Sequence, residues 1–271
     1  MPTLAHLSDL HLGRDEATGA AARRLARALL AAGVDRLLLT GDLTHRGQRG
    51  ELHEFEEVFA PWRDAGRLTL VPGNHDRLGH DLGGALMPGD RVQVEEHEGL
   101  HLVRLDSTGP HNRSFLSGHG ALAPGDLDLV DRALAAARPG ALRVLMLHHH
   151  PLPLPEDCLV ERLSSWLGRP WTAELALGPA LLARIAGRCD LVLHGHRHAA
   201  SRVELEGAAG APLAVLNAGC STELEAARLL DYADGRVAGE RWLHSDAGVA
   251  PILAPRPAAR APRPVDPGLA A

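Results

Sequence analysis

The sequence predicts an α/β fold in which helices cover a β-sheet, and three observations support this prediction. Short apolar runs at 3–7 and 36–40 are typical of strands, the second of them buried. Helix-like runs at about 18–32 and 51–65 alternate with these strands and lead to a third one at 67–71. Strands that alternate with helices in this way form a sheet between helices.

The later part of the chain continues the pattern. We expect further strands at 91–94, 100–105, 143–147, 190–193, 213–217, 226–232 and 236–243, and helices at about 124–137 and 178–187. Asp234-Gly235 predicts a hairpin turn between the last two strands. The Pro-rich segment 151–179 is expected to be a loop with short helices. We therefore expect one domain over 1–250 and a disordered Pro/Ala-rich tail over 251–271.

Composition excludes several classes of protein. The chain has 271 residues with 28 basic and 34 acidic ones, and the net charge of −6 argues against stable nucleic-acid binding. Three scattered cysteines without a CxxC pair form neither a disulfide framework nor a thiolate zinc site. No apolar stretch approaches the roughly 18 residues of a membrane span, so we expect a cytoplasmic protein. The unusual feature is the 17 histidines.

Polar clusters stand where five of the expected strands end. They contain Asp9 and His11; Asp42; Asn74, His75 and Asp76; His148, His149 and His150; and His196 and His198. Residues two apart share one side of an extended segment, so Asp9 could join His11, and His196 could join His198. Each cluster alone could also be an ordinary polar turn. Open α/β sheets place ligands at strand ends, and five coincidences in this order favour a single site.

The residue types indicate which ligand such a site would take. Two carboxylates, an amide oxygen and several imidazoles, without thiolate, suit Mn, Fe, Zn or Co rather than Ca. They are too many for one tetrahedral zinc ion. Two divalent or mixed-valence ions that share a bridging carboxylate would use them all.

In this order, the motifs Asp-x-His, Gly-Asp, Gly-Asn-His-Asp, His before Pro and Gly-His-x-His resemble the calcineurin-like metallophosphoesterase superfamily. The resemblance implies a four-layer α/β/β/α sandwich of two mixed sheets flanked by helices. By position, one metal would be held by Asp9, His11 and His198. The other would be held by Asn74, His149 and His196, with Asp42 as the bridge. Alignment on Pro151 selects His149, and His148 is the alternative.

The run His148-His149-His150-Pro151 and the segment Leu105–Thr108 resemble the bacterial cyclic-nucleotide phosphodiesterases. This implies hydrolysis of small phosphodiesters, with 3′,5′-cyclic AMP as the leading candidate, by a metal-activated hydroxide. His75 would lie near the phosphate and leaving group, and Asp76 would either orient His75 or cap a turn. The alternative substrates are phosphomonoesters, phosphoproteins or a nucleotide-lipid pyrophosphate, and a scaffold without catalysis is the third hypothesis. We expect a monomer or small homo-oligomer.

Overall fold

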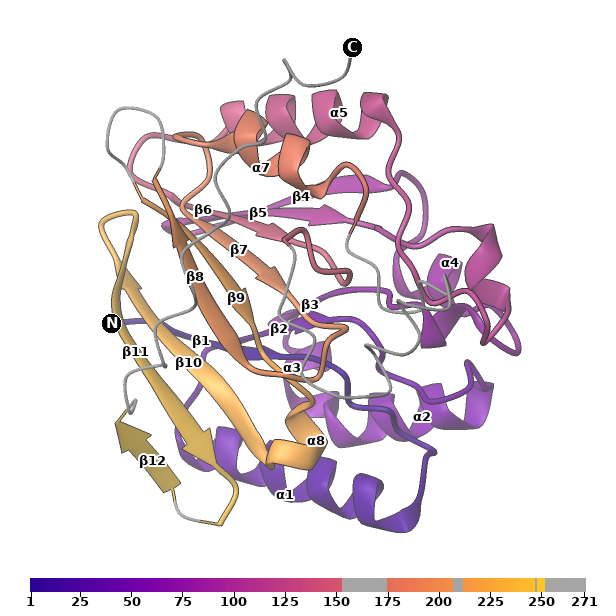
Figure 1. Cartoon of the computed structure of the whole chain (residues 1–271). Coiled ribbons are helices and arrows are strands. Elements are labelled where there is room, and N and C mark those ends of the chain that lie inside the picture. Colours follow the sequence, from indigo (N-terminus) through magenta and orange to yellow (C-terminus); the bar gives the residue numbers. More distant parts are fainter. Residues whose placement is uncertain (153–174, 207–211, 247, 252–271) are drawn as a thin grey trace.

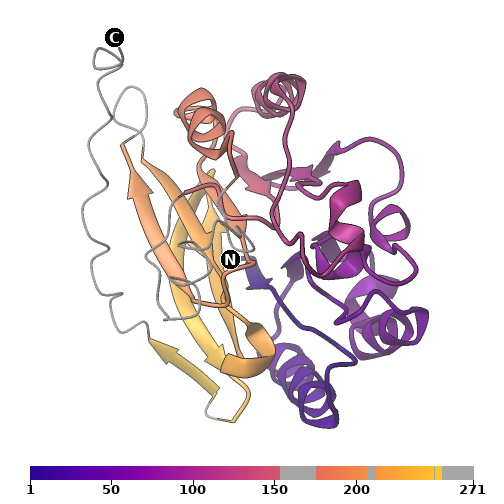
Figure 2. The ribbon, with the colours of Figure 1, turned by 45° about the vertical axis from the view of Figure 1, so that its right-hand side comes forward.

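The computed structural model describes residues 1–152, 175–206, 212–246 and 248–251. Its strands form two six-stranded sheets. The sheets lie face to face between two layers of helices (Figure 1). This arrangement confirms the expected four-layer α/β/β/α sandwich, and Figure 2 shows the helices on the outer face of each sheet.

The first sheet joins strands from both ends of the described chain. β1 (Thr3–Leu7), β2 (Arg36–Thr40) and β3 (Leu68–Val71) are parallel. Antiparallel strands extend the sheet on the other side of β1, in the order β10 (Ala226–Ala233), β11 (Arg236–His244) and β12 (Gly248–Pro251). Pro251, the first residue of the expected tail, thus ends a strand, and 252–271 lie outside the described residues.

The second sheet is also mixed. Its four central strands are parallel: β5 (Leu100–Leu105), β6 (Leu142–Met146), β7 (Leu191–His194) and β9 (Leu213–Asn217). Antiparallel strands form both edges, β4 (Val92–His97) beside β5 and β8 (Ser201–Leu205) beside β9. The central strands are almost continuously apolar because both of their faces are covered.

Alternation along the strands divides the apolar side chains into three clusters. In β2, Leu38 packs between the two sheets, whereas Leu37 and Leu39 face the outer helices. Those helices are α1 (Glu16–Ala31), α2 (Arg49–Val58) and α3 (Ala60–Asp64). On the second sheet, α5 (Pro124–Ala135) and α7 (Gly178–Ile185) cover the third cluster. Each sheet is therefore buried on two faces where its parallel strands lie.

Some expected elements differ from those observed. The single helix expected over 51–65 is two helices, α2 and α3, with a break at Phe59, because Pro61 has no amide hydrogen to donate to the carbonyl four residues earlier. The edge strand β8 was not expected, since its residues are only partly buried and do not form an apolar run. Most of the expected loop over 151–179, its residues 153–174, lies outside the described residues.

Parallel strands direct their carboxyl ends toward one edge of each sheet, and this places the predicted site. β1, β2 and β3 end just before the first three polar clusters, and β6 and β7 end beside the other two. Across the described ranges, we find no helix with the length and apolar character needed to cross a membrane.

Candidate metal centre

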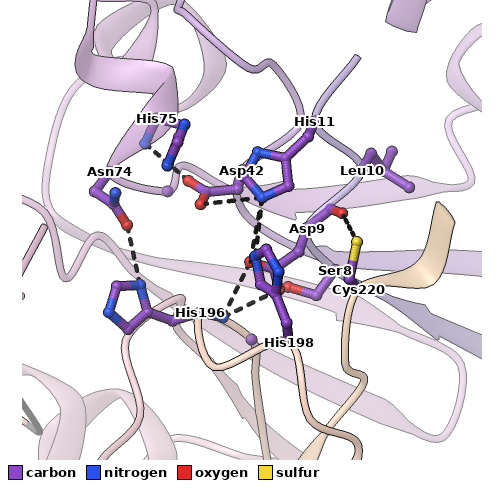
Figure 3. A network of polar contacts seen from close by, with 12 residues as sticks. Ser8, Asp9, Leu10, His11, Asp42, Asn74, His75, His196, His198 and Cys220 are labelled. Carbon is purple, nitrogen blue, oxygen red and sulfur yellow. Dashed lines mark hydrogen bonds and ion pairs between the residues drawn. The ribbon is translucent and has the colours of Figure 1, made fainter. Parts of the chain in front are cut away.

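Loops at the carboxyl ends of five strands meet at the site. Backbone hydrogen bonds align the loop after β1 with the loop after β2: the Asp9 amide donates to the Gly41 carbonyl and the His11 amide to the Asp42 carbonyl, each at 3.0 Å. The Gly195 amide donates to the His148 carbonyl at 3.0 Å and joins the loops after β7 and β6. Figure 3 shows side chains from the loops after β1, β2, β3 and β7 turned toward one another.

Left-handed backbone marks the predicted ligands. Of the eight non-glycine residues with positive φ in the described chain, five are predicted ligands: Asp9, His11, Asp42, His196 and His198, with φ between 41° and 73°. Such conformations cost on the order of 1 kcal/mol each and cluster at functional sites. The expectation that Asp9–His11 and His196–His198 lie on extended segments is therefore wrong. Sharply turned loops bring Asp9 Oδ1 within 4.0 Å of His11 Nε2, whereas His196 and His198 join different donor groups.

Asp9, His11 and His198 form the first group of donors. His11 Nε2 lies 3.0 Å from His198 Nε2, and Asp9 Oδ1 lies 3.4 Å from the same His198 atom (Figure 3). Burial lowers the pKa of His11 to about 3, so its imidazole is neutral. Burial also opposes protonation of His198, but Asp9 raises its pKa above the ordinary value. One potential ligand atom from each residue lies within 4.8 Å of the others.

Asp42 lies between this group and a second one. Its Oδ2 is 3.9 Å from His11 Nε2 and 3.4 Å from His148 Nε2, while its Oδ1 accepts a hydrogen bond from the His75 amide at 2.8 Å. Burial would raise the pKa of Asp42, but the imidazoles of His148 and His75 lower it well below its usual value. A charged carboxylate thus faces both donor groups.

Asn74, His148 and His196 form the second group. Asn74 Oδ1 lies 3.1 Å from His148 Nε2 and 3.0 Å from His196 Nδ1. His148 Nδ1 is 2.7 Å from the Thr40 carbonyl, which can only accept, so this nitrogen carries the hydrogen. In the neutral ring, the lone pair on Nε2 then faces the oxygens of Asn74 and Asp42.

His149 makes different contacts from those of His148. The Ser107 hydroxyl accepts the backbone N–H groups of His148 and His149 at 3.3 and 3.2 Å, so its own hydrogen points to His149 Nδ1 at 2.9 Å. His149 Nε2 then donates to the Gly118 carbonyl at 3.0 Å. Both ring nitrogens of His149 are occupied by these two bonds.

The donor set fits a pair of divalent cations. Oxygens of Asp42 and Asn74 face nitrogen lone pairs, and such atoms repel one another unless a cation lies between them. In the metal-free protein a proton takes the place of that cation, because Asp42 overcomes the effect of burial and raises the pKa of His148 to about 9. The buried Nε2 of His196 has no hydrogen-bond partner within the described structure. His196 Nδ1, not Nε2, is the nitrogen that faces the Asn74 oxygen, at 3.0 Å.

His75 and Asp76 lie beside this centre but do not form the pair considered from the sequence. His75 Nδ1 donates to the His45 carbonyl at 2.8 Å. Every hydrogen bond found for the Asp76 carboxylate in the described chain comes from Leu43, Thr44 or Gly73, four contacts of 2.7–3.3 Å. Asp76 thus ties the loop after β3 to the loop after β2. Burial and Asp42 raise the pKa of Asp76 above its usual value.

Supporting residues were missed in the sequence. The Thr40 carbonyl orients His148, and the His45 carbonyl orients His75. A side-chain motif in the sequence cannot predict such a contact with the backbone. The Cys220 thiol donates to the Asp9 carbonyl at 3.0 Å (Figure 3). Burial raises its pKa to about 11, so it remains a thiol and not a thiolate ligand. Of these supporting residues, only Ser107 lies in a segment that the sequence singled out, Leu105–Thr108.

Comparison with known proteins identifies relatives of the chain. The chain is 33% identical to the 3′,5′-cyclic adenosine monophosphate phosphodiesterase CpdA of Escherichia coli K12, and equally to that of strain O157:H7, over 125 residues. The match covers 44% of this chain and 41% of each relative, so it spans less than half of either protein.

Two solved structures share the fold at 12% identity and a TM-score of 0.62. One is a dimetal phosphatase from Danio rerio, with 93% of this chain and 96% of that one covered. The other is purple acid phosphatase PPD1 from yellow lupin, Lupinus luteus, with 92% and 52% covered. Residues 2–200 match the sequence pattern of the calcineurin-like phosphoesterases. The chain therefore belongs to the calcineurin-like phosphoesterase family.

Proposed function

We propose that the protein is a dinuclear-metal-dependent phosphodiesterase for small substrates, with 3′,5′-cyclic AMP as the leading candidate. The observation that carries the proposal is the position of Asp42, whose Oδ2 lies between the donor groups at 3.4 and 3.9 Å from their nearest imidazoles. Asp9, His11 and His198 would hold one ion. Asn74, His148 and His196 would hold the other, and Asp42 would bridge the two.

His148, rather than His149, takes the second histidine position in this proposal. His148 Nε2 faces Asn74 and Asp42, whereas both nitrogens of His149 are used by Ser107 and Gly118. In this proposal His148 binds the metal centre, and His149 holds the loop that contains Gly118. This is the alternative that the sequence alignment left open.

When bound, two divalent ions lower the pKa of a water molecule and neutralise charge on phosphoryl oxygens. The protein contributes only two carboxylates to the proposed ligand set, Asp9 and Asp42, so the loaded centre would keep a net positive charge. That charge attracts an anionic phosphate even though the chain carries a net charge of −6.

His75 is the residue placed to assist at the phosphate. Its amide contacts Asp42, and its Nδ1 is bonded to the His45 carbonyl, so Nε2 is the nitrogen left for the substrate. That atom can stabilise charge on a phosphoryl oxygen or pass a proton to the departing alkoxide. Asp76 acts at a distance by holding the loop that carries His75.

Two features favour a cyclic-nucleotide substrate: the likeness to CpdA, whose name states that activity, and the Leu105–Thr108 segment. In that segment, Asp106 binds Arg77 and Thr108 while Ser107 holds His149, so the motif supports the site.

A substrate panel on manganese-loaded protein tests the proposal. We expect cleavage of bis-p-nitrophenyl phosphate and of cyclic AMP, and at least a hundredfold loss in Asp42→Asn with unchanged circular dichroism. Faster cleavage of p-nitrophenyl phosphate, a phosphopeptide or a nucleotide-lipid pyrophosphate would replace the diester assignment. Full turnover by Asp42→Asn would show that the site is misassigned.

A further inference from the structure

An exposed apolar pair lies at the rim of the metal centre. Phe115 is 60% exposed and its neighbour Leu116 is 69% exposed. The other two phenylalanines of the chain, Phe55 and Phe59, are buried beneath the helices of the first sheet. Adjacent exposed apolar side chains beside a functional site are candidates for a ligand contact. Phe115 and Leu116 form such a pair.

The ring of Phe115 contacts His75. The two ring centroids are 5.9 Å apart and the planes meet at 79°, an edge-to-face arrangement. The His75 amide and ring are held by Asp42 and by the His45 carbonyl, so the aromatic edge stands at a defined distance from the proposed metal bridge. A phosphate at His75 would have its organic substituent within reach of Phe115.

The loop that carries Phe115 is tied to the site on both sides. Before Phe115, the Gly109 amide donates to the side chain of Asn112 at 2.8 Å. The amide group of Asn112 donates across the loop to the carbonyls of Ser117 and His119, at 2.6 and 3.0 Å. After Phe115, the Gly118 carbonyl accepts from His149. These hydrogen bonds fix the loop on both sides of Phe115, which is exposed to solvent beside His75.

We propose that Phe115, with Leu116 beside it, is a platform for a flat aromatic group of the substrate, such as a nucleobase. The inference rests on the proposed phosphodiesterase function, because it places the phosphate at His75. Phe115 is 60% exposed although its ring contacts His75, so part of its surface remains for stacking, and stacking would bury apolar surface on both partners. The platform would make Phe115 a specificity residue without any part in the chemical step.

Calorimetric binding to manganese-loaded protein tests the platform without relying on turnover. Adenosine 5′-monophosphate and ribose 5-phosphate share a sugar and a phosphate and differ in the base. We expect the first to bind roughly tenfold more tightly, within the range of base–aromatic stacking. In Phe115→Ala this ratio should fall close to one while the affinity for ribose 5-phosphate is unchanged. Phe115→Trp should preserve the ratio.

Leu129→Ala is the matched control, because Leu129 is an apolar side chain on α5 that is 43% exposed. It should behave as the unaltered protein does. An unchanged ratio in Phe115→Ala, an equal loss for both ligands, or no preference in the unaltered protein would overturn the platform. Cleavage of bis-p-nitrophenyl phosphate by the unaltered protein separates the two proposals, since its absence would count against the phosphodiesterase function itself.

Discussion

The division of labour between His148 and His149 can be tested by removing each imidazole in turn. His148→Ala deletes a proposed ligand that lies within 3.4 Å of the oxygens of both Asn74 and Asp42. Loss of groups that only orient a ligand weakens metal binding by about 10–100-fold, so deletion of the ligand itself should exceed about 100-fold, or about 3 kcal/mol. The second ion should then be lost on dialysis.

His149→Ala should keep both ions and lose stability instead. The substitution removes hydrogen bonds to Ser107 and Gly118, at about 1 kcal/mol each, and leaves a cavity in a fully buried position. We expect about 3 kcal/mol less free energy of unfolding.

Elemental analysis after dialysis and urea unfolding measure the two effects separately. Two ions retained by His148→Ala, with one lost from His149→Ala, would refute the assignment.

Three further outcomes follow from the same contacts. Thr44→Val removes a buried hydroxyl that donates to Asp76 at 2.7 Å, so the free energy of unfolding should fall by about 2 kcal/mol in a urea titration; no change would show that Asp76 does not hold the loops. In chelated protein, Asp42 outweighs the effect of burial and raises the pKa of folded His148 from 6.5 to about 9. The stability that comes from protonation of His148 is therefore present below pH 6.5 and is lost as the pH rises to 9. A urea midpoint that does not change over this window, or the same slope in His148→Gln, would contradict this expectation. Mn²⁺ at a hundredfold excess over its dissociation constant should raise the free energy of unfolding by about 2.7 kcal/mol, an increase that Asp42→Asn should reduce.

Much of the sandwich could be predicted because local patterns are strong where strands are buried. The run Arg36–Thr40 is apolar enough to identify β2, and its carboxyl end gives the place of Asp42. The edge strand β8 has no comparable pattern, since pairing with β9 rather than its own residues makes it a strand. Phe55 and Trp62 pack in one cluster although the helix breaks between them at Phe59, so the apolar pattern of 51–65 does not reveal that two helices form it.

The sequence named residues that the structure brings close together, but it did not reveal how they meet. Asp9 and His11 do meet His198, but through left-handed turns that a two-residue spacing cannot reveal. Whether Asp76 orients His75 or holds a turn also depends on contacts from another loop, and the donors from Leu43 and Thr44 favour the second role.

The order of residues alone was enough to name the chemical groups and the strands that deliver them, because ligand types and buried strands each leave a short-range pattern. Long-range contacts determine which histidine faces the proposed metal centre. A hydroxyl on the segment after β5 turns His149 toward the Gly118 loop, and a carbonyl at the end of β2 turns His148 toward Asp42. Neighbours in the chain share a backbone but not an environment, so the direction of each ring depends on the partners that folding brings beside it.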